Sequence, residues 1–177
     1  MPASELLRLI TVLAYLVAAV FCGITAVRSH RPARSTWIGI TLILTFLGIS
    51  KHWNLIPGWV NSLRELAWLQ GWYDLRQAFQ VLFIAIILLF LLAWFLAILR
   101  NAPWQLWLPI TSTTILLTLS VIRAVSLHAL DFFLYQELVP NVQPNWIIEL
   151  GSIAVLWVST LVYLFADLFE KSAPSHK

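Results

Sequence analysis

Residues 81–99, with the sequence VLFIAIILLFLLAWFLAIL, contain no charged, amide or hydroxyl side chain. A helix of about 20 such residues is long enough to cross the roughly 30 Å hydrocarbon core of a bilayer. The run is continuously apolar, whereas strands of outer-membrane barrels alternate over about ten residues. Four further apolar runs accompany it, each bounded by charges, Pro or Asn. The predicted helices cover residues 6–27, 36–53, 75–99, 104–126 and 145–168.

The composition of the chain agrees with a membrane protein. Of 177 residues, 60% are hydrophobic and 11% are charged, whereas soluble domains carry about 25% charged residues; the mean hydropathy is +0.85. The net charge is +3, and the sequence contains no cluster of Lys and Arg. Nucleic acid is therefore excluded as a partner. A single cysteine, Cys22, excludes an intrachain disulfide and a thiolate metal cluster. We predict an all-α integral membrane helical bundle in a single domain, residues 1–177, embedded in the lipid bilayer.

The first apolar run resembles a signal peptide but is better interpreted as a retained helix. Glu5 precedes it, and the run from Leu9 to Val27 is long enough to span. The bulky Phe21 before Cys22 also disfavours a lipoprotein processing site.

The basic residues suggest an orientation for five crossings. One side holds six of them, namely Arg28, Arg31, Arg34, Arg100, Lys171 and Lys177. The other side holds five, namely Arg8, Lys51, Arg64, Arg76 and Arg123, three of which adjoin apolar runs and have acids nearby. The positive-inside rule places the N-terminus outside and the C-terminus in the cytoplasm.

The connection between the second and third helices also has a predicted structure. Pro57 and Gly58 break the chain, and Ser62 with Glu65 has the spacing of a capping box. We therefore expect a short interfacial helix within residues 56–73.

Polar residues accumulate on one side of the predicted bundle, where helix 2 ends, helix 3 begins, helix 4 ends and helix 5 begins. Ionisable groups cost at least about 2.5–3.5 kcal/mol each at membrane depth, so several of them in one layer suggest mutual pairing around a ligand. The expected ligand-binding residues are Lys51, Arg64, Tyr73, Arg76, Gln77, Gln80, Arg123, Ser126, His128 and Asp131. Arg76 and Arg123 are expected to be the main contacts, with Asp131 holding His128 or Arg123.

This set predicts binding of a small anionic molecule or a lipid headgroup, because arginine offers charge-assisted, bidentate hydrogen bonds. Four basic residues, Lys51, Arg64, Arg76 and Arg123, are matched by Glu65, Asp74, Asp131 and Glu149. A balanced network also exists without a ligand, so the affinity is expected to be modest. A network that only ties the helices together, or charges that simply reach the interface, are the alternative interpretations.

Other functional classes remain open from the sequence. An intramembrane enzyme would use His128 and Asp131 as an oriented base; a zinc site would draw on His52, His128, Asp131 and Glu149 or Glu65, and a haem on His52 and His128. None of these has HExxH spacing, so no cofactor is expected. An accessory subunit of a larger membrane complex, or a homo-oligomer, is the third class. The apolar runs show no repeated small-xxx-small pattern for tight helix packing, since Gly39 and Gly48 stand alone.

Three groups of residues carry a resemblance that covers about 80 central residues. They are Lys51-x-x-Asn54-Leu55, then Gln70-Gly71-Trp72-Tyr73-x-x-Arg76-x-x-x-Gln80, then Arg123-Ala124-x-Ser126-x-His128-x-x-Asp131. The pattern resembles a family of small, uncharacterised bacterial multi-span membrane proteins. The chain departs from it at Asn54, Gln77 and Ala129, where the family has Asp, Arg and often a second His. The resemblance implies a bacterial inner-membrane location and the position of the site, without a mechanism.

Overall fold

Five α-helices account for most of the described chain. The computed structural model describes residues 3–30, 33–53, 76–125 and 143–172, and the single positions 55, 58, 62, 65 and 69. The helices are α1 (Ala3–Arg28), α2 (Ala33–His52), α4 (Arg76–Asn101), α5 (Trp107–Val125) and α7 (Pro144–Ser172), with a 3₁₀ turn, η2 (Trp104–Leu106), leading into α5. The described residues contain no strand. The all-α prediction is confirmed. The first and last residues of each predicted helix lie within four residues of those observed.

Four of these helices are long and apolar enough to cross a membrane. They contain the segments Glu5–Arg28, Ala33–His52, Trp104–Arg123 and Pro144–Ala166. In α4 the apolar helical stretch whose side chains the structure describes is Ala85–Asn101, and residues 81–84 before it are also apolar in the sequence. The interfacial helix predicted within residues 56–73 lies largely outside the described residues.

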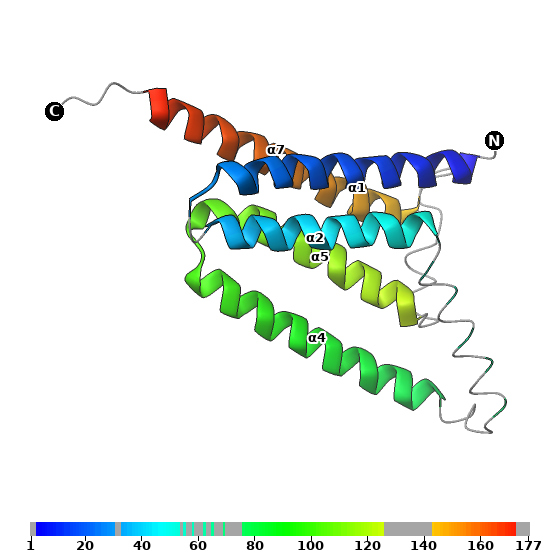
Figure 1. Cartoon of the computed structure of the whole chain (residues 1–177). Helices are drawn as coiled ribbons and strands as arrows, with labels where there is room; N and C mark the ends of the chain where they lie inside the picture. The colour runs from blue at the N-terminus through cyan, green and yellow to red at the C-terminus, as the bar shows by residue number, and fades with distance from the viewer. Residues whose placement is uncertain are drawn as a thin grey trace.

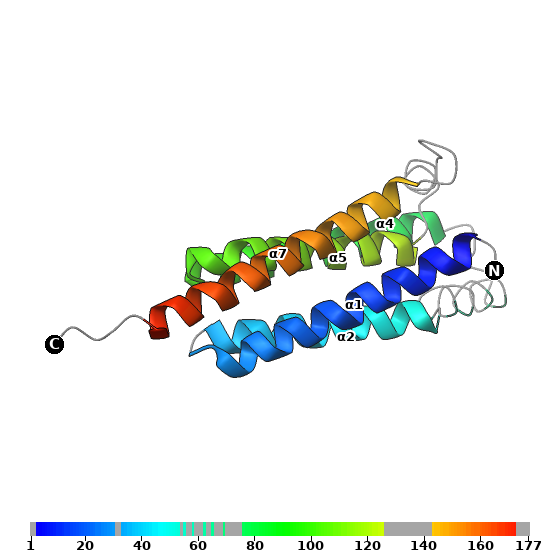
Figure 2. The same ribbon diagram turned by 90° about the horizontal axis from the view of Figure 1, so that it is seen from above.

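The helices alternate in direction along the bundle. Figure 1 shows that α1 begins, α2 ends, α4 begins, α5 ends and α7 begins at the same end. In Figure 2, α1 and α2 lie on one side and α4 and α5 on the other, and α7 crosses obliquely from the side of α1 and α2 to the side of α4 and α5. The helix ends that the sequence assigns to one side, those of helices 2 to 5, therefore lie at the same end of the bundle.

Among the described helices, α1 packs most extensively against α2, and Gly48 lets the two helices approach closely. Ala18, Cys22 and Ala26 are buried at intervals of four residues on α1. On α2, a Cβ added at Gly48 would lie 3.1 Å from Tyr15 Cβ. The sequence expectation weighed only glycines and did not consider this alanine and cysteine spacing. Cys22 Sγ lies 3.7 Å from Thr160 Oγ1, so this face of α1 also contacts α7.

Apolar packing fills the bundle away from its polar end. Trp37, Leu44, Leu106, Leu116 and Leu156 are completely buried and belong to one core cluster. The Trp37 ring also meets the Tyr163 ring edge-on, with centroids 5.4 Å apart, a favourable geometry for aromatic pairs.

Most hydroxyl groups inside the helices bond to their own backbone. Thr25, Thr41, Thr113 and Thr160 each donate to the carbonyl four residues earlier, at 2.7–2.9 Å. Hydrocarbon offers no water to satisfy such groups, so this local bond lets them lie at membrane depth.

Candidate functional site

Glu149 is the centre of the polar end of the bundle. It lies in the second turn of α7 and is only 2% exposed. An ionised carboxylate without partners is very costly to bury, so a buried glutamate is normally paired and hydrogen-bonded. Its partners therefore identify the polar site.

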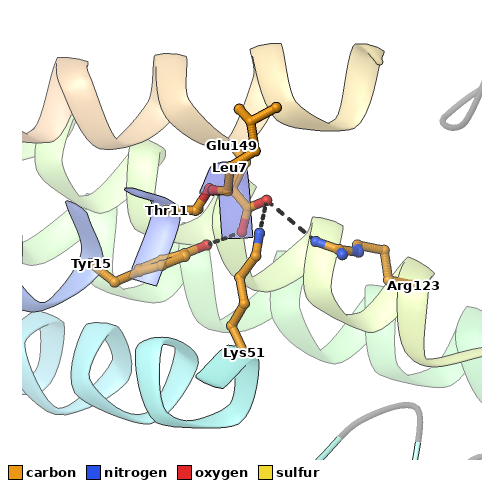
Figure 3. Close-up of polar contacts among 6 residues, drawn as sticks. All are labelled: Leu7, Thr11, Tyr15, Lys51, Arg123 and Glu149. Atoms are coloured by element: carbon orange, nitrogen blue, oxygen red, sulfur yellow. Dashed lines mark hydrogen bonds and ion pairs between the residues drawn. The ribbon is translucent and has the colours of Figure 1, made fainter. Parts of the chain in front are cut away.

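Three side chains from three other helices donate to this carboxylate (Figure 3). The Tyr15 hydroxyl of α1 donates to Oε1 at 3.0 Å. Lys51 Nζ of α2 and Arg123 Nη1 of α5 both reach Oε2, at 2.5 and 3.3 Å. One carboxylate thus joins α1, α2, α5 and α7. We call Tyr15, Lys51, Arg123 and Glu149 the Glu149 cluster.

The local sequence explains why both cations are stable here. Lys51 lies in the last turn of α2 and Arg123 in the last turn of α5. The carbonyl end of a helix carries partial negative charge, which favours a nearby cation. Each long side chain then extends from its helix end toward Glu149, as Figure 3 shows.

Exposure differs sharply across the cluster. The side chain of Glu149 is 3% exposed, whereas those of Lys51 and Arg123 are 14% and 28% exposed. The carboxylate is thus held inside the bundle, and both cationic side chains are more exposed than it is.

Nearby polar atoms differ in whether they are already satisfied. Thr11, which is buried beside the cluster in Figure 3, donates to Leu7 O at 2.7 Å. By contrast, Ser50 Oγ and Asn145 Oδ1 are buried without a hydrogen-bond partner among the described residues. Ser50 precedes Lys51, and Asn145 lies one turn before Glu149. Two buried polar atoms without a hydrogen-bond partner among the described residues therefore lie near the cluster in sequence.

The structure brings two of the predicted ligand-binding residues together, Lys51 and Arg123. For Arg76, Gln77 and Gln80 it places only the backbone, in the first two turns of α4 at the same end of the bundle. The remaining five predicted residues lie outside the described residues, namely Arg64, Tyr73, Ser126, His128 and Asp131. The predicted contact of Arg123 with Asp131 therefore stays a prediction, while its observed contact is with Glu149.

Of the residues predicted for a zinc site, the structure describes only His52, Glu65 and Glu149. His52 is exposed, and its ring lies 6.1 Å from the ring of Trp53. Among the described residues, no group of three His, Cys, Asp or Glu side chains could hold a metal ion. Both oxygens of Glu149 instead accept hydrogen bonds from protein donors.

Sequence reasoning missed Tyr15, the partner from α1. A helical period could have found it, because Thr11, Tyr15, Ala18, Cys22 and Thr25 follow one another at intervals of three or four residues. All five are buried. This polar and small face stands out within an otherwise strongly apolar helix, and it is the face directed into the bundle.

Comparisons with protein-family models, with curated proteins and with solved structures give no match for this chain.

Proposed function

We propose that this chain is a multi-span protein of a bacterial inner membrane that binds a small anionic group at the Glu149 cluster. The group would be a phosphate or carboxylate, either in a free solute or in a lipid headgroup. In this proposal α4 is the fifth crossing and the cluster faces the extracytoplasmic side. The uneven distribution of loop arginines and the resemblance to small bacterial multi-span proteins support the location.

The observation that carries the proposal is the meeting of two cations at one carboxylate oxygen. Lys51 and Arg123 come from different helices and both reach Glu149 Oε2. A pair of cations fixed this close together is already arranged for a second anion, and fixed groups lose little freedom on binding. The greater exposure of both cations than of Glu149 gives the anion an approach.

Glu149 would act as a positioning residue in such a site. Its carboxylate holds the Lys51 ammonium in place through one of that group's three N–H donors. A bound anion would accept from the others while Glu149 keeps its place. Because the same cations serve both acids, binding competes with the internal ion pair, and we expect a modest affinity.

Thermal unfolding of the purified protein in an uncharged detergent tests this proposal. Inorganic phosphate is compared with chloride at equal ionic strength, and phosphatidylglycerol with phosphatidylcholine. A ligand at ten times its Kd adds about 1.4 kcal/mol of stability, which corresponds to a rise of about 3 °C in Tm for a chain of this size. A response to phosphate identifies a free anion, and a response to phosphatidylglycerol alone identifies a headgroup.

The matched variants are Lys51→Gln and Arg28→Gln. Both remove one basic charge, but Arg28 is exposed at the opposite end of α1 from the cluster. We expect Lys51→Gln to fold and to lose the response, and Arg28→Gln to keep it. Lower stability of Lys51→Gln with an unchanged response would show that the network is only structural, and the proposal would be wrong.

The proposed orientation has its own test. A reporter fused after Lys177 should be active in the cytoplasm, and one inserted between Gly58 and Asn61 should be active on the far side. Both reporters mapping to the same face would contradict five crossings and would also separate the polar helix ends.

A further inference from the structure

A large groove lies at the end of the bundle opposite the Glu149 cluster. Its volume is about 1290 Å³, and its walls are η2, the first turns of α5 and the part of α7 from Ala154 to Ala166. His30 and Ala33, at the start of α2, close one end. Pockets for drug-sized ligands measure about 300–1,000 Å³, so this groove has room for a larger or longer molecule.

The groove has the shape and surface of an acyl-chain site. Along α7 it extends from Ala154 to Ala166, a distance of about 18 Å at 1.5 Å per residue. The wall residues Val158 and Val162 are 61% and 62% exposed. Apolar side chains open to the surroundings along this length match an extended hydrocarbon chain better than a compact polar solute.

Amphipathic side chains mark one end of the groove as the headgroup level. Trp104 and Trp107 both line it and are 76% and 50% exposed. The Trp107 indole donates to the carbonyl of Ala102 at 3.3 Å. Exposed tryptophans with an apolar body and a polar edge are typical of the boundary between hydrocarbon and headgroups.

One arginine and one histidine lie at this end of the groove. His30 lines it, Arg34 lies one residue after the lining Ala33, and both side chains are exposed. Helices α2 and α5 also begin here, and the N-terminal ends of helices carry partial positive charge. In the five-crossing topology proposed above, the sequence assigns six basic residues and two acids, Asp167 and Glu170, to this side.

From this combination we infer that the groove between α5 and α7 binds one anionic phospholipid. An acyl chain lies along α7 past Val158, and the phosphate lies beside His30 and Arg34. Basic pockets between membrane helices on the cytoplasmic side are suited to anionic headgroups, since each nearby Lys or Arg contributes about 1 kcal/mol. The site is separate from the Glu149 cluster and does not depend on anion binding there, but its cytoplasmic position rests on the orientation proposed above.

Native mass spectrometry of the full chain in mild detergent tests this inference. The protein is exposed to equal amounts of phosphatidylglycerol and phosphatidylcholine with identical acyl chains, and the lipid retained is counted. We expect one phosphatidylglycerol per chain, retained at least about fivefold more than phosphatidylcholine. Equal retention of the two lipids would overturn the inference.

Two tryptophan substitutions locate the lipid. Val158→Trp fills the groove, whereas Val20→Trp makes the same change at a residue of the same 61% exposure on α1. We expect loss of the retained lipid only in Val158→Trp. Equal retention of lipid in both variants contradicts the inference. The inference is also contradicted if the unmodified protein forms dimers and Val158→Trp abolishes them without loss of lipid, because a second copy of the chain would then occupy the groove.

Charge substitutions test the position of the headgroup. Arg34→Gln should lower retention of phosphatidylglycerol about fivefold, which corresponds to about 1 kcal/mol, and leave phosphatidylcholine unchanged. Lys51→Gln, at the other end of the bundle, should change the retention of neither phosphatidylglycerol nor phosphatidylcholine. Unchanged phosphatidylglycerol in Arg34→Gln would contradict the assigned headgroup position.

Discussion

The two ends of the bundle are held together by different interactions. At one end a single buried carboxylate collects donors from three other helices. Toward the other end, Trp37 packs against Tyr163, and leucines such as Leu106 and Leu156 fill the core without charge. Apolar packing constrains shape, but an ion pair also fixes which helices must meet, because a buried charge without its partner is costly. The polar end is thus the more sensitive to substitution.

The largest effect is expected for Glu149→Ala. The variant removes the carboxylate that Lys51 and Arg123 share, and breaking a buried ion pair typically costs about 3–5 kcal/mol. Thermal or denaturant unfolding in detergent measures the loss. A cost below about 1 kcal/mol would show that solvent already compensates both cations, and the contrast between the two ends would disappear.

The apolar end should respond less strongly. Leu156→Ala removes a completely buried side chain and should cost about 2 kcal/mol, the lower end of the range for such changes in water, because lipid is as apolar as leucine. The control Val155→Ala, at a residue 44% exposed on the same helix, should stay within about 0.5 kcal/mol. Equal costs for the two variants would contradict the core assigned here.

Two glycines of α2 sharpen the comparison within one helix. Gly48→Ala places its Cβ against the Tyr15 Cβ at 3.1 Å, a contact that only a helix movement can relieve, whereas the same change at Gly39 meets nothing within 4 Å. We expect a net cost of about 1 kcal/mol for Gly48→Ala. Gly39→Ala should be neutral or stabilising by up to about 1 kcal/mol, because alanine favours the helix. The same sign for both changes in unfolding experiments would argue against the close approach of α1 to α2.

The smallest effect is expected for Tyr15→Phe. This change deletes one hydrogen bond to Glu149 Oε1 and leaves the two cations in place. Hydrogen bonds between membrane helices average about 0.6 kcal/mol and reach about 1.7 kcal/mol. A loss as large as that for Glu149→Ala would mean that the hydroxyl, and not the ion pairs, dominates the cluster.

The sequence predicted the helices well because each apolar run is long and bounded by charges, Pro or Asn. It also placed Lys51, Arg123 and Glu149 at one end, since alternating helix directions determine which ends meet. Individual contacts could not be obtained in the same way. The contact of Arg123 with Glu149 on another helix was not predicted, because it depends on helix rotation and packing. Tyr15 was missed because attention went to charges, whereas a phenol can serve the same carboxylate.

The most direct test of the account compares the phosphate response of Lys51→Gln with that of Glu149→Gln. Glutamine keeps the size of glutamate and an acceptor for Tyr15, but it removes the charge that competes with a bound anion. In unfolding measurements at increasing inorganic phosphate, we predict that Lys51→Gln loses the rise in Tm and that Glu149→Gln shows a larger rise than the unmodified protein. The opposite signs follow from competition between Glu149 and the ligand for the same cations. Two variants that are both less stable and both unresponsive, or a response that survives in Lys51→Gln, would contradict anion binding at the Glu149 cluster.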